Sequence, residues 1–377
     1  MNYAALPRGM MATGAAVGGG GVVPASAVRV AVAEEDALPT GDAKQTGDRE
    51  GDACDASGGK CDLDVKACGC MGKCCCSCFS YRFFGDFLWL RSRDSEVAYA
   101  VEANLNLPAP PIQVSPIAVL DQDAGMGFRV GFGIDLTPCS DLVMTYTHFE
   151  TNTSSQITQV GAGTGISAMT LHPGTLAADT QTVAAEGRHD IDFDLIDLDY
   201  RRLLWCRGNT QITGLGGLRW GQLQQNFWAN YTDAFGTPPD TRSETDIDFS
   251  GVGIRMGLEA EAFAPRRCLM FYAKGYANLL CGEFDATYRQ IGDNGATVEV
   301  DTQWQAGRIV PTFDLEVGGG YYSKGGNLRI TAGYLINVWT NMVKTDDFIH
   351  AVQTNDFRDM SSSMTFDGLV ARVEGRF

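Results

Sequence analysis

The chain ends with the sequence MTFDGLVARVEGRF, residues 364–377, and this stretch gives the clearest indication of the fold. Apolar and charged residues alternate within it, with Leu369, Ala371, Val373 and Phe377 on one face and Arg372, Glu374 and Arg376 on the other. A period of two residues indicates a β-strand with one apolar and one polar face. In a soluble sheet the apolar face packs on a core, whereas in a membrane barrel it contacts lipid and the charges line the lumen.

The same alternation recurs throughout the second part of the chain. The ten segments that carry it are residues 81–89, 128–136, 142–147, 191–205, 212–220, 252–260, 271–279, 312–317, 328–337 and 364–377. The fourth segment changes phase at Leu195-Ile196, which predicts a β-bulge. Ten is an even number, as single-chain bacterial barrels generally require.

Short and long connections alternate between these segments. The short ones are residues 138–140, 206–209, 265–268 and 323–326, and the long ones are residues 94–126, 150–189, 227–247, 283–309 and 342–363. An outer-membrane barrel has this asymmetry, because its periplasmic turns are short and its external loops are long. We therefore predict an all-β protein, an antiparallel transmembrane β-barrel of about ten strands (range eight to twelve). Trp89, Trp220 and Trp339 are expected in its outer aromatic girdle.

Composition divides the chain into three parts. Residues 1–27 are mostly small and apolar and end in Ala25-Ser26-Ala27, which predicts a signal peptide. Residues 28–79 are acidic and rich in cysteine and show no apolar period, so we expect a disordered leader. Residues 80–377 form the predicted barrel. The mean hydropathy of −0.10 agrees with strands that alternate instead of forming apolar blocks.

Two stretches resemble a known family. They are Ile196-Asp197-Leu198-Asp199-Tyr200-Arg201-Arg202 and Gly216-Gly217-Leu218-Arg219-Trp220-Gly221-Gln222-Leu223-Gln224-Gln225-Asn226-Phe227, and both are similar to the Legionella-type major outer-membrane protein family. Residues 127–131 and 145–149 also resemble an early hairpin of that family. The similarity covers roughly residues 81–377 and lies in the strands. The family is described as pore-forming, so the resemblance implies a porin-like function in the bacterial cell outer membrane.

The partners expected from the sequence are those of an outer-membrane barrel. A last strand that ends in Phe377 resembles the signal that the barrel assembly machinery recognises, and the apolar face requires outer-membrane lipid. The net charge of −17 argues against nucleic acid, because phosphate contacts need a basic face. Small hydrophilic solutes or ions are the expected cargo, and no cofactor is expected.

Charged residues occupy the positions that would face the lumen. These candidates are Arg82, Asp86, Arg129, Asp135, Arg219, Arg255, Glu259, Lys274, Asp314, Glu316, Arg329, Arg372 and Glu374, and in the same phase we place Asp192 and Asp194. They predict a polar path of mixed charge for passive passage. The alternative is a set of salt bridges that plugs a narrow barrel, since eight strands leave room only for side chains.

The sequence offers little support for an enzyme. His148 and His189 flank the second long connection near Glu150 and Asp190, but no nucleophile elbow, zinc-protease motif or phosphate loop accompanies them. We expect neither catalytic residues nor a metal site. A structural or adhesive surface barrel, which would use the Thr/Ser/Gly-rich stretch from Asn152 to Gly187, remains the alternative to a pore.

Cysteines gather at both regions that the topology assigns to the periplasm. The candidates for disulfides are Cys54, Cys61, Cys68, Cys70, Cys74, Cys75, Cys76 and Cys78 in the leader and Cys139, Cys206 and Cys268 in short turns. The periplasm is oxidising, which favours disulfides within the chain or to other envelope proteins. The competing interpretations are metal binding by Cys75-x-x-Cys78 and Cys68-x-Cys70, and turn cysteines that are incidental.

Overall fold

A computed structural model describes residues 80–104, 112–137, 139–161, 163–175, 182–233, 241–264, 268–292, 297–323 and 327–377. Contacts divide the chain into residues 1–60 and 61–377, and every described residue belongs to the second unit. The expected signal peptide and leader therefore lie outside the described residues, as do the eight leader cysteines.

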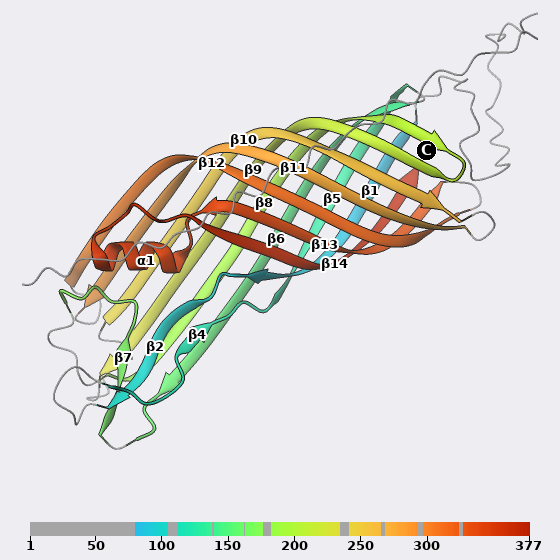
Figure 1. Ribbon diagram of the computed structural model, residues 1–377. Coiled ribbons are helices and arrows are strands. Elements are labelled where there is room, and N and C mark those ends of the chain that lie inside the picture. Colours follow the sequence, from blue (N-terminus) through green and yellow to red (C-terminus); the bar gives the residue numbers. More distant parts are fainter. Residues whose placement is uncertain are drawn as a thin grey trace, which may run out of the picture. The chain divides into compact units, whose positions relative to one another are not determined.

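Ten antiparallel strands close into a barrel, which confirms the predicted fold and strand number (Figure 1). They are β1 (Tyr81–Arg93), β5 (Ala124–Thr137), β6 (Ser140–Thr158), β8 (Thr182–Arg207), β9 (Thr210–Asp233), β10 (Thr241–Phe263), β11 (Leu269–Gly292), β12 (Thr297–Tyr322), β13 (Leu328–Met342) and β14 (Ser362–Arg376). Each strand pairs with its neighbour in sequence, and β14 closes the ring on β1. The terminal Phe377 exchanges two backbone hydrogen bonds with Tyr81, at 2.9 and 3.0 Å.

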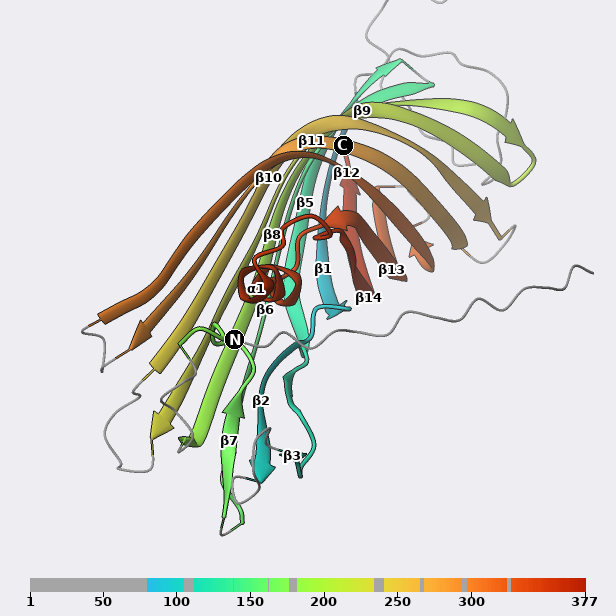
Figure 2. The same cartoon turned by 60° about the vertical axis from the view of Figure 1, so that its left-hand side comes forward.

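The barrel has two different ends. Short connections join β5 to β6, β8 to β9, β10 to β11 and β12 to β13 at what we call the turn end. The opposite end, which we call the rim end, is uneven. Strands β8 to β12 are 23 to 26 residues long, whereas β1, β5, β13 and β14 are 13 to 15 residues long. About 9–11 residues are enough for a strand to cross a bilayer. The long strands therefore continue well beyond the membrane as a wall on one side of the rim (Figure 2).

The faces of the long strands change character along their length. In β8, Ile191, Phe193 and Leu195 point inward and are buried, while Leu198 and Tyr200 point outward and are 43% and 45% exposed. The rim half thus has an apolar inside and a polar outside, as in a soluble barrel. The turn half has an apolar outside and a charged inside, as in a membrane barrel.

This reversal explains two wrong predictions. The phase change at Leu195-Ile196 is not a bulge, because the register of β8 is continuous there and shifts only near its two ends. Apolar side chains point inward before this position and outward after it, while successive residues of β8 continue to alternate between the two faces. For the same reason the expected long connections 227–247 and 283–309 are mostly strand, and Asn152–Gly187 contributes to β6, β7 and β8.

Two additional elements cover the rim end. Strand β2 (Val97–Asn104) pairs with β3 (Ile112–Gln113), β4 (Ala118–Leu120) and β7 (Thr164–Ala168) in a small sheet that we call the lid. Helix α1 (Thr345–Thr354) lies in the connection between β13 and β14 and contacts β2, β10 and β11 (Figure 2). No helix among the described residues is long and apolar enough to cross a membrane.

Helix α1 is short, and its ends follow familiar rules. Asp346 and Asp347 lie in its first turn, where the helix dipole favours negative charge. Asn355 adopts a left-handed conformation with φ of 53° and closes the C-terminus, and its N–H donates back to the carbonyl of Val352. A helix of this length is marginal alone, so its buried face must stabilise it. That face consists of Phe348, Ile349 and Val352.

The orientation of β10 can be tested with spin labels in a variant that lacks the other cysteines. Met256 is 55% exposed on the outer face, whereas Arg255 and Glu259 are each 7% exposed and point inward. A label at position 256 should collide readily with dissolved oxygen and rarely with a water-soluble nickel complex, because it lies in lipid. A label at position 259 should be inaccessible to both. Accessibility of position 259 to the nickel complex would contradict the closed interior.

Candidate functional site

Acidic and basic side chains fill the turn half of the barrel interior. The structure places the predicted lumen residues on inward-facing positions of eight strands, and Asp135 lies half-buried at the turn end of β5. Ion pairs join nine basic side chains to nine acidic ones there: Arg82, Arg129, Arg201, Arg219, Arg255, Lys274, Arg329, Arg372 and Arg376 with Asp86, Asp141, Asp197, Asp199, Glu259, Glu261, Asp314, Glu316 and Glu374. We call this set the ion network.

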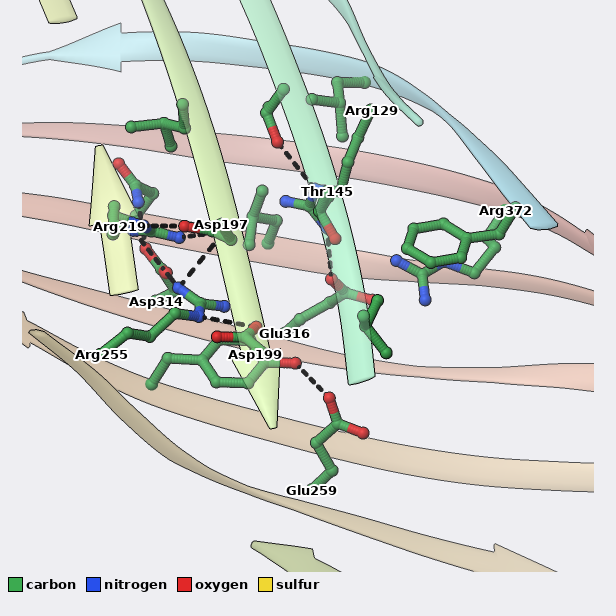
Figure 3. Close-up of a pocket in the computed structure, with 18 of the residues that line it drawn as sticks. Arg129, Thr145, Asp197, Asp199, Arg219, Arg255, Glu259, Asp314, Glu316 and Arg372 are labelled. Atoms are coloured by element: carbon green, nitrogen blue, oxygen red, sulfur yellow. Dashed lines mark hydrogen bonds and ion pairs between the residues drawn. The ribbon is translucent and has the colours of Figure 1, made fainter. Parts of the chain in front are cut away.

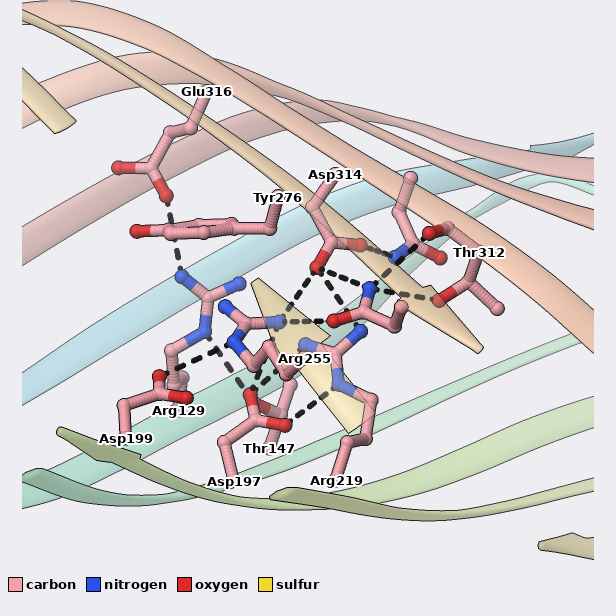
Figure 4. Close-up of polar contacts among 12 residues, drawn as sticks. Arg129, Thr147, Asp197, Asp199, Arg219, Arg255, Tyr276, Thr312, Asp314 and Glu316 are labelled. Atoms are coloured by element: carbon pink, nitrogen blue, oxygen red, sulfur yellow. Dashed lines mark hydrogen bonds and ion pairs between the residues drawn. The ribbon is translucent and has the colours of Figure 1, made fainter. Parts of the chain in front are cut away.

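The centre of the ion network is a cluster of two arginines and three aspartates (Figures 3 and 4). Arg219 forms a two-pronged contact with Asp197, at 2.6 and 2.9 Å, and lies 3.0 Å from Asp314. Arg255 reaches Asp314 at 3.0 Å and Asp199 at 3.2 Å. All five side chains are 3–9% exposed, so their charges must compensate one another inside the protein.

Aromatic and amide groups support the central cluster. The guanidinium carbon of Arg255 lies 4.0 Å from the ring centroid of Tyr276, whose hydroxyl donates to Glu259 at 2.6 Å. Arg255 also donates to Asn278 at 3.1 Å, and the Asn278 amide donates to the Thr312 hydroxyl at 2.9 Å (Figure 4). Each group fixes the next, which makes the network rigid.

A second cluster joins the first and last strands of the barrel. Arg372 of β14 forms a two-pronged contact with Asp86 of β1, at 2.7 and 2.8 Å. Arg129 bridges Asp86 and Glu316, at 3.3 and 3.2 Å, and Lys274 lies 2.8 Å from Glu316. Barrel closure therefore brings together charges that are as much as 286 residues apart.

Sequence reasoning missed several members of the network and misplaced two others. Asp197 and Asp199 face inward, whereas the expected inward residues Asp192 and Asp194 face outward. The cause is the misread phase of β8, since a shift of one residue exchanges the two faces. Asp141 and Arg201 also belong to the network and were missed. Asp141 adjoins a predicted turn, and Arg201 lies after the predicted bulge, where no lumen residue was expected.

Little space remains inside the network. A central cavity of about 60 Å³ is bounded by Arg129, Asp197, Arg255 and Tyr276 among others (Figure 3). A water molecule occupies about 30 Å³ in the liquid, so this volume suits a few water molecules. It is a small space within the network, far smaller than the aqueous channel of a porin.

An apolar layer lies above the network toward the rim. Phe193, Phe249, Phe284, Trp339 and Phe366 are at most 3% exposed. Ring centroids are 4.7 Å apart for Phe249 and Phe284 and 4.9 Å apart for Phe193 and Phe366, so the rings are in direct contact. We call these five side chains the aromatic layer, and ring contacts within it join residues of β8, β10, β11, β13 and β14.

Trp339 corrects another prediction. The sequence places it in the outer aromatic girdle, but its side chain points inward and is fully buried. Its indole N–H donates to Asn337, which also donates to Asp314. Trp339 therefore links the aromatic layer to the ion network.

The lid and α1 are fastened to the inner surface of the wall by buried hydrogen bonds. Tyr231 donates to the carbonyl of Tyr99 at 2.7 Å, and Tyr288 donates to the carbonyl of Thr170 at 2.8 Å. Gln225 donates to the carbonyl of Val343 at 2.9 Å, immediately before α1. The lid, the aromatic layer and the ion network thus occupy three successive levels of the interior.

Glu102 holds the turn of the lid in place, and this contact is testable. Its carboxylate accepts hydrogen bonds from the Thr164 hydroxyl and from the N–H groups of Gly161 and Val160, which keep the pKa of Glu102 below its usual range. The stabilisation is present at neutral pH and is lost as pH falls through this lowered pKa. Glu102→Gln should therefore speed amide hydrogen exchange at Gly161 at pH 7, and Glu96→Gln should not. Equal exchange rates in Glu102→Gln and wild type would contradict this.

The histidines do not form a catalytic pair. His148 lies on the outer face of β6, with Nδ1 at 2.9 Å from Asp194. His189 is buried inside, with Nε2 at 3.3 Å from the Thr345 hydroxyl. The two rings are on opposite faces of the wall. The described residues contain no group of three or more His, Cys, Asp or Glu side chains arranged to hold a metal.

The cysteines of the barrel are divided between its end and its outer face. Cys139, Cys206 and Cys268 all lie at the turn end, as the predicted topology requires. Cys281 lies on the exposed outer face of β11. No disulfide joins two of these four described cysteines, so their predicted bonds would involve other residues.

Comparison with known proteins gives one family and several distant structures. The family model described as "Legionella pneumophila major outer membrane protein precursor" matches residues 73–374. The outer membrane protease OmpT from Escherichia coli is 11% identical, with 79% of this chain and 97% of that chain covered and a TM-score of 0.44. A major outer membrane protein from Thermus thermophilus is 10% identical, with 79% and 99% covered and a TM-score of 0.31. No curated protein sequence matches.

Proposed function

Since this chain belongs to the Legionella pneumophila major outer membrane protein family and is thus a bacterial outer-membrane β-barrel, we propose that it is a structural surface barrel with a closed lumen. Its turn half sits in the membrane, and its wall, lid and α1 project outside. The observation that carries this proposal is the aromatic layer, whose five side chains are at most 3% exposed and are joined by ring contacts between strands.

The ion network supports the same proposal. An aqueous channel requires hydrated charged groups, whereas the central side chains here are 3–9% exposed and occupied by one another. A solute would have to break several buried ion pairs, and each rupture leaves an uncompensated charge at a cost of about 3–5 kcal/mol. A barrel of ten strands is close to the size that side chains alone can fill.

Liposome swelling tests this proposal. Vesicles that contain the purified barrel should not admit arabinose faster than vesicles without protein. A parallel preparation with a known porin shows that the assay reports entry. Rapid swelling with the wild-type barrel would overturn the closed-lumen proposal.

A second candidate is porin-like passage of small hydrophilic solutes or ions through an opened state. Its support is the family resemblance together with the charged turn half, which would form a polar path if the aromatic layer moved and the ion pairs below it separated. The network has equal numbers of basic and acidic side chains, so we expect such a path to discriminate weakly between cations and anions. Arabinose entry with the wild-type barrel in the swelling assay would support this second candidate.

The cysteines suggest that the barrel is anchored covalently in the envelope. By outer-membrane topology the turn end faces the periplasm, which places Cys139, Cys206 and Cys268 on the same side as the predicted leader. We propose that disulfides join the leader to these turns or to neighbouring envelope proteins. The periplasm favours this oxidation.

Non-reducing electrophoresis of isolated envelopes tests the cross-links. Bands larger than the monomer should appear and collapse to monomer after reduction. Replacement of Cys139, Cys206 and Cys268 by serine should remove those that depend on the turns, whereas Cys281→Ser should leave them unchanged. A monomer band with freely alkylated turn cysteines in the wild type would contradict the proposal.

A further inference from the structure

A cleft of about 380 Å³ lies between the lid and α1, outside the closed lumen. Its lining includes Glu96 and Val97 from the start of the lid, Val119 from β4, and Asp346, Ile349 and His350 from α1. Cavities of roughly 300–1,000 Å³ accommodate small organic molecules. The cleft is thus large enough for a small ligand and too small for a folded partner.

The floor of the cleft is apolar. Val97 and Ile349 are 2% and 4% exposed and belong to the core beneath the lid, and Val119 is 41% exposed at its edge. An apolar body of a ligand would cover the Val119 side chain and gain the free energy of removing both surfaces from water. The floor alone would bind any small apolar group, so specificity must come from the polar side chains.

The polar side chains of the cleft carry negative charge. Glu96 is exposed, and Asp346 is half-buried in the first turn of α1. Burial raises the pKa of Asp346, because its carboxylate loses contact with water. The ammonium of Lys344 forms an ion pair with Asp346 at 3.9 Å, which is longer than a hydrogen bond, and Lys344 does not line the cleft. No basic lysine or arginine is among the residues that line it.

We propose that this cleft binds a small organic cation, an ammonium compound with a short apolar body. The cationic group would lie between Glu96 and Asp346, and the apolar body would cover Val119 and Ile349. The cation would offset the charge of a carboxylate that is partly removed from water, and the imidazole of His350 offers a further hydrogen-bond acceptor. Because the residues come from both the lid and α1, the ligand would hold these two elements together.

The probe for this site is 4-fluorobenzylammonium, followed by fluorine NMR with the full-length barrel in detergent micelles. Its signal should broaden saturably with wild-type protein and not with empty micelles. The neutral analogue 4-fluorobenzyl alcohol has the same apolar body and should bind at least about tenfold more weakly. Equal binding of the alcohol would overturn the proposal, since it would show simple apolar partition.

Substitutions locate the site. Glu96→Gln with Asp346→Asn should weaken binding of 4-fluorobenzylammonium by at least about tenfold. Asp347→Asn is the matched control, because the Asp347 carboxylate accepts a hydrogen bond from Ser362 and does not line the cleft. Folding of each variant is checked by its circular dichroism. Unchanged binding in the folded double variant, or absence of saturable binding to the wild type, would overturn the proposal. The liposome swelling result has no influence on these outcomes.

Discussion

Arg255→Met is expected to lower the free energy of unfolding by about 3–5 kcal/mol, the usual cost of removing one partner from a buried ion pair. Arg255 contacts Asp314 at 3.0 Å and Asp199 at 3.2 Å, and it stacks on Tyr276. Methionine occupies similar space but leaves Asp199 without its ion-pair partner. Guanidinium unfolding of the barrel in lipid vesicles measures the change.

Two further variants isolate the electrostatic cause. Arg188→Met removes an arginine that pairs with Asp190 on the outer surface, where it is 46% exposed, so the loss should stay within about 1 kcal/mol. Arg255→Met combined with Asp199→Leu removes both charges and should recover part of the stability, because an apolar replacement of a buried ion pair is often neutral. A double variant as unstable as the sum of its two single variants would contradict this explanation.

Trp339→Ala should also destabilise the barrel by about 3–5 kcal/mol, which is typical of truncating a large buried aromatic residue. Trp339 is fully buried, contacts Phe193 and Phe249, and donates to Asn337. The substitution therefore leaves a cavity and deprives the Asn337 carbonyl of a donor. The same unfolding measurement applies.

Trp89→Ala is the matched control. Trp89 is 49% exposed on the outer face of β1, where lipid can fill the space that its side chain leaves. Its truncation should cost clearly less than that of Trp339. If the two substitutions lowered the free energy of unfolding equally, Trp339 would belong to a lipid-facing girdle, as the sequence alone predicted.

The sequence was sufficient for the membrane half of the barrel. In β10 and β14, apolar residues alternate with charged ones, and lipid outside and charge inside require that pattern. Ile254 and Met256 are accordingly exposed on the outer face, while Arg255 is buried. The ten strands and their order follow from this alternation and from the short connections at the turn end.

The same reasoning could not predict the rim half, because there the apolar residues face inward and the polar residues face outward. Phe193 and Leu195 continue the inward face of β8 that carries Asp197 and Asp199 lower down. If all apolar residues of β8 are assumed to face lipid, a bulge is needed at Leu195-Ile196 to keep them on one face. Helix α1 was missed for a related reason, since ten residues make a weak periodic signal and its stability depends on burial of Phe348 and Ile349.

The sequence could predict that charged residues of both signs face the interior, but not which of them form ion pairs. Asp86 and Arg372 are close because β1 and β14 close the barrel in a register that places them opposite one another. Whether such charged side chains are hydrated or paired with one another depends on what lies between them and the rim end. The aromatic layer lies on their rim side, and its residues are scattered over β8 to β14.

Conductance of the purified wild-type barrel in a planar lipid bilayer tests the closed lumen most directly. Insertion is followed independently by fluorescent labelling, so that an absence of current can be assigned to inserted protein. The account predicts no stepwise current at moderate voltage in 1 M potassium chloride. Reproducible stepwise currents from the inserted wild type would contradict it and favour the pore.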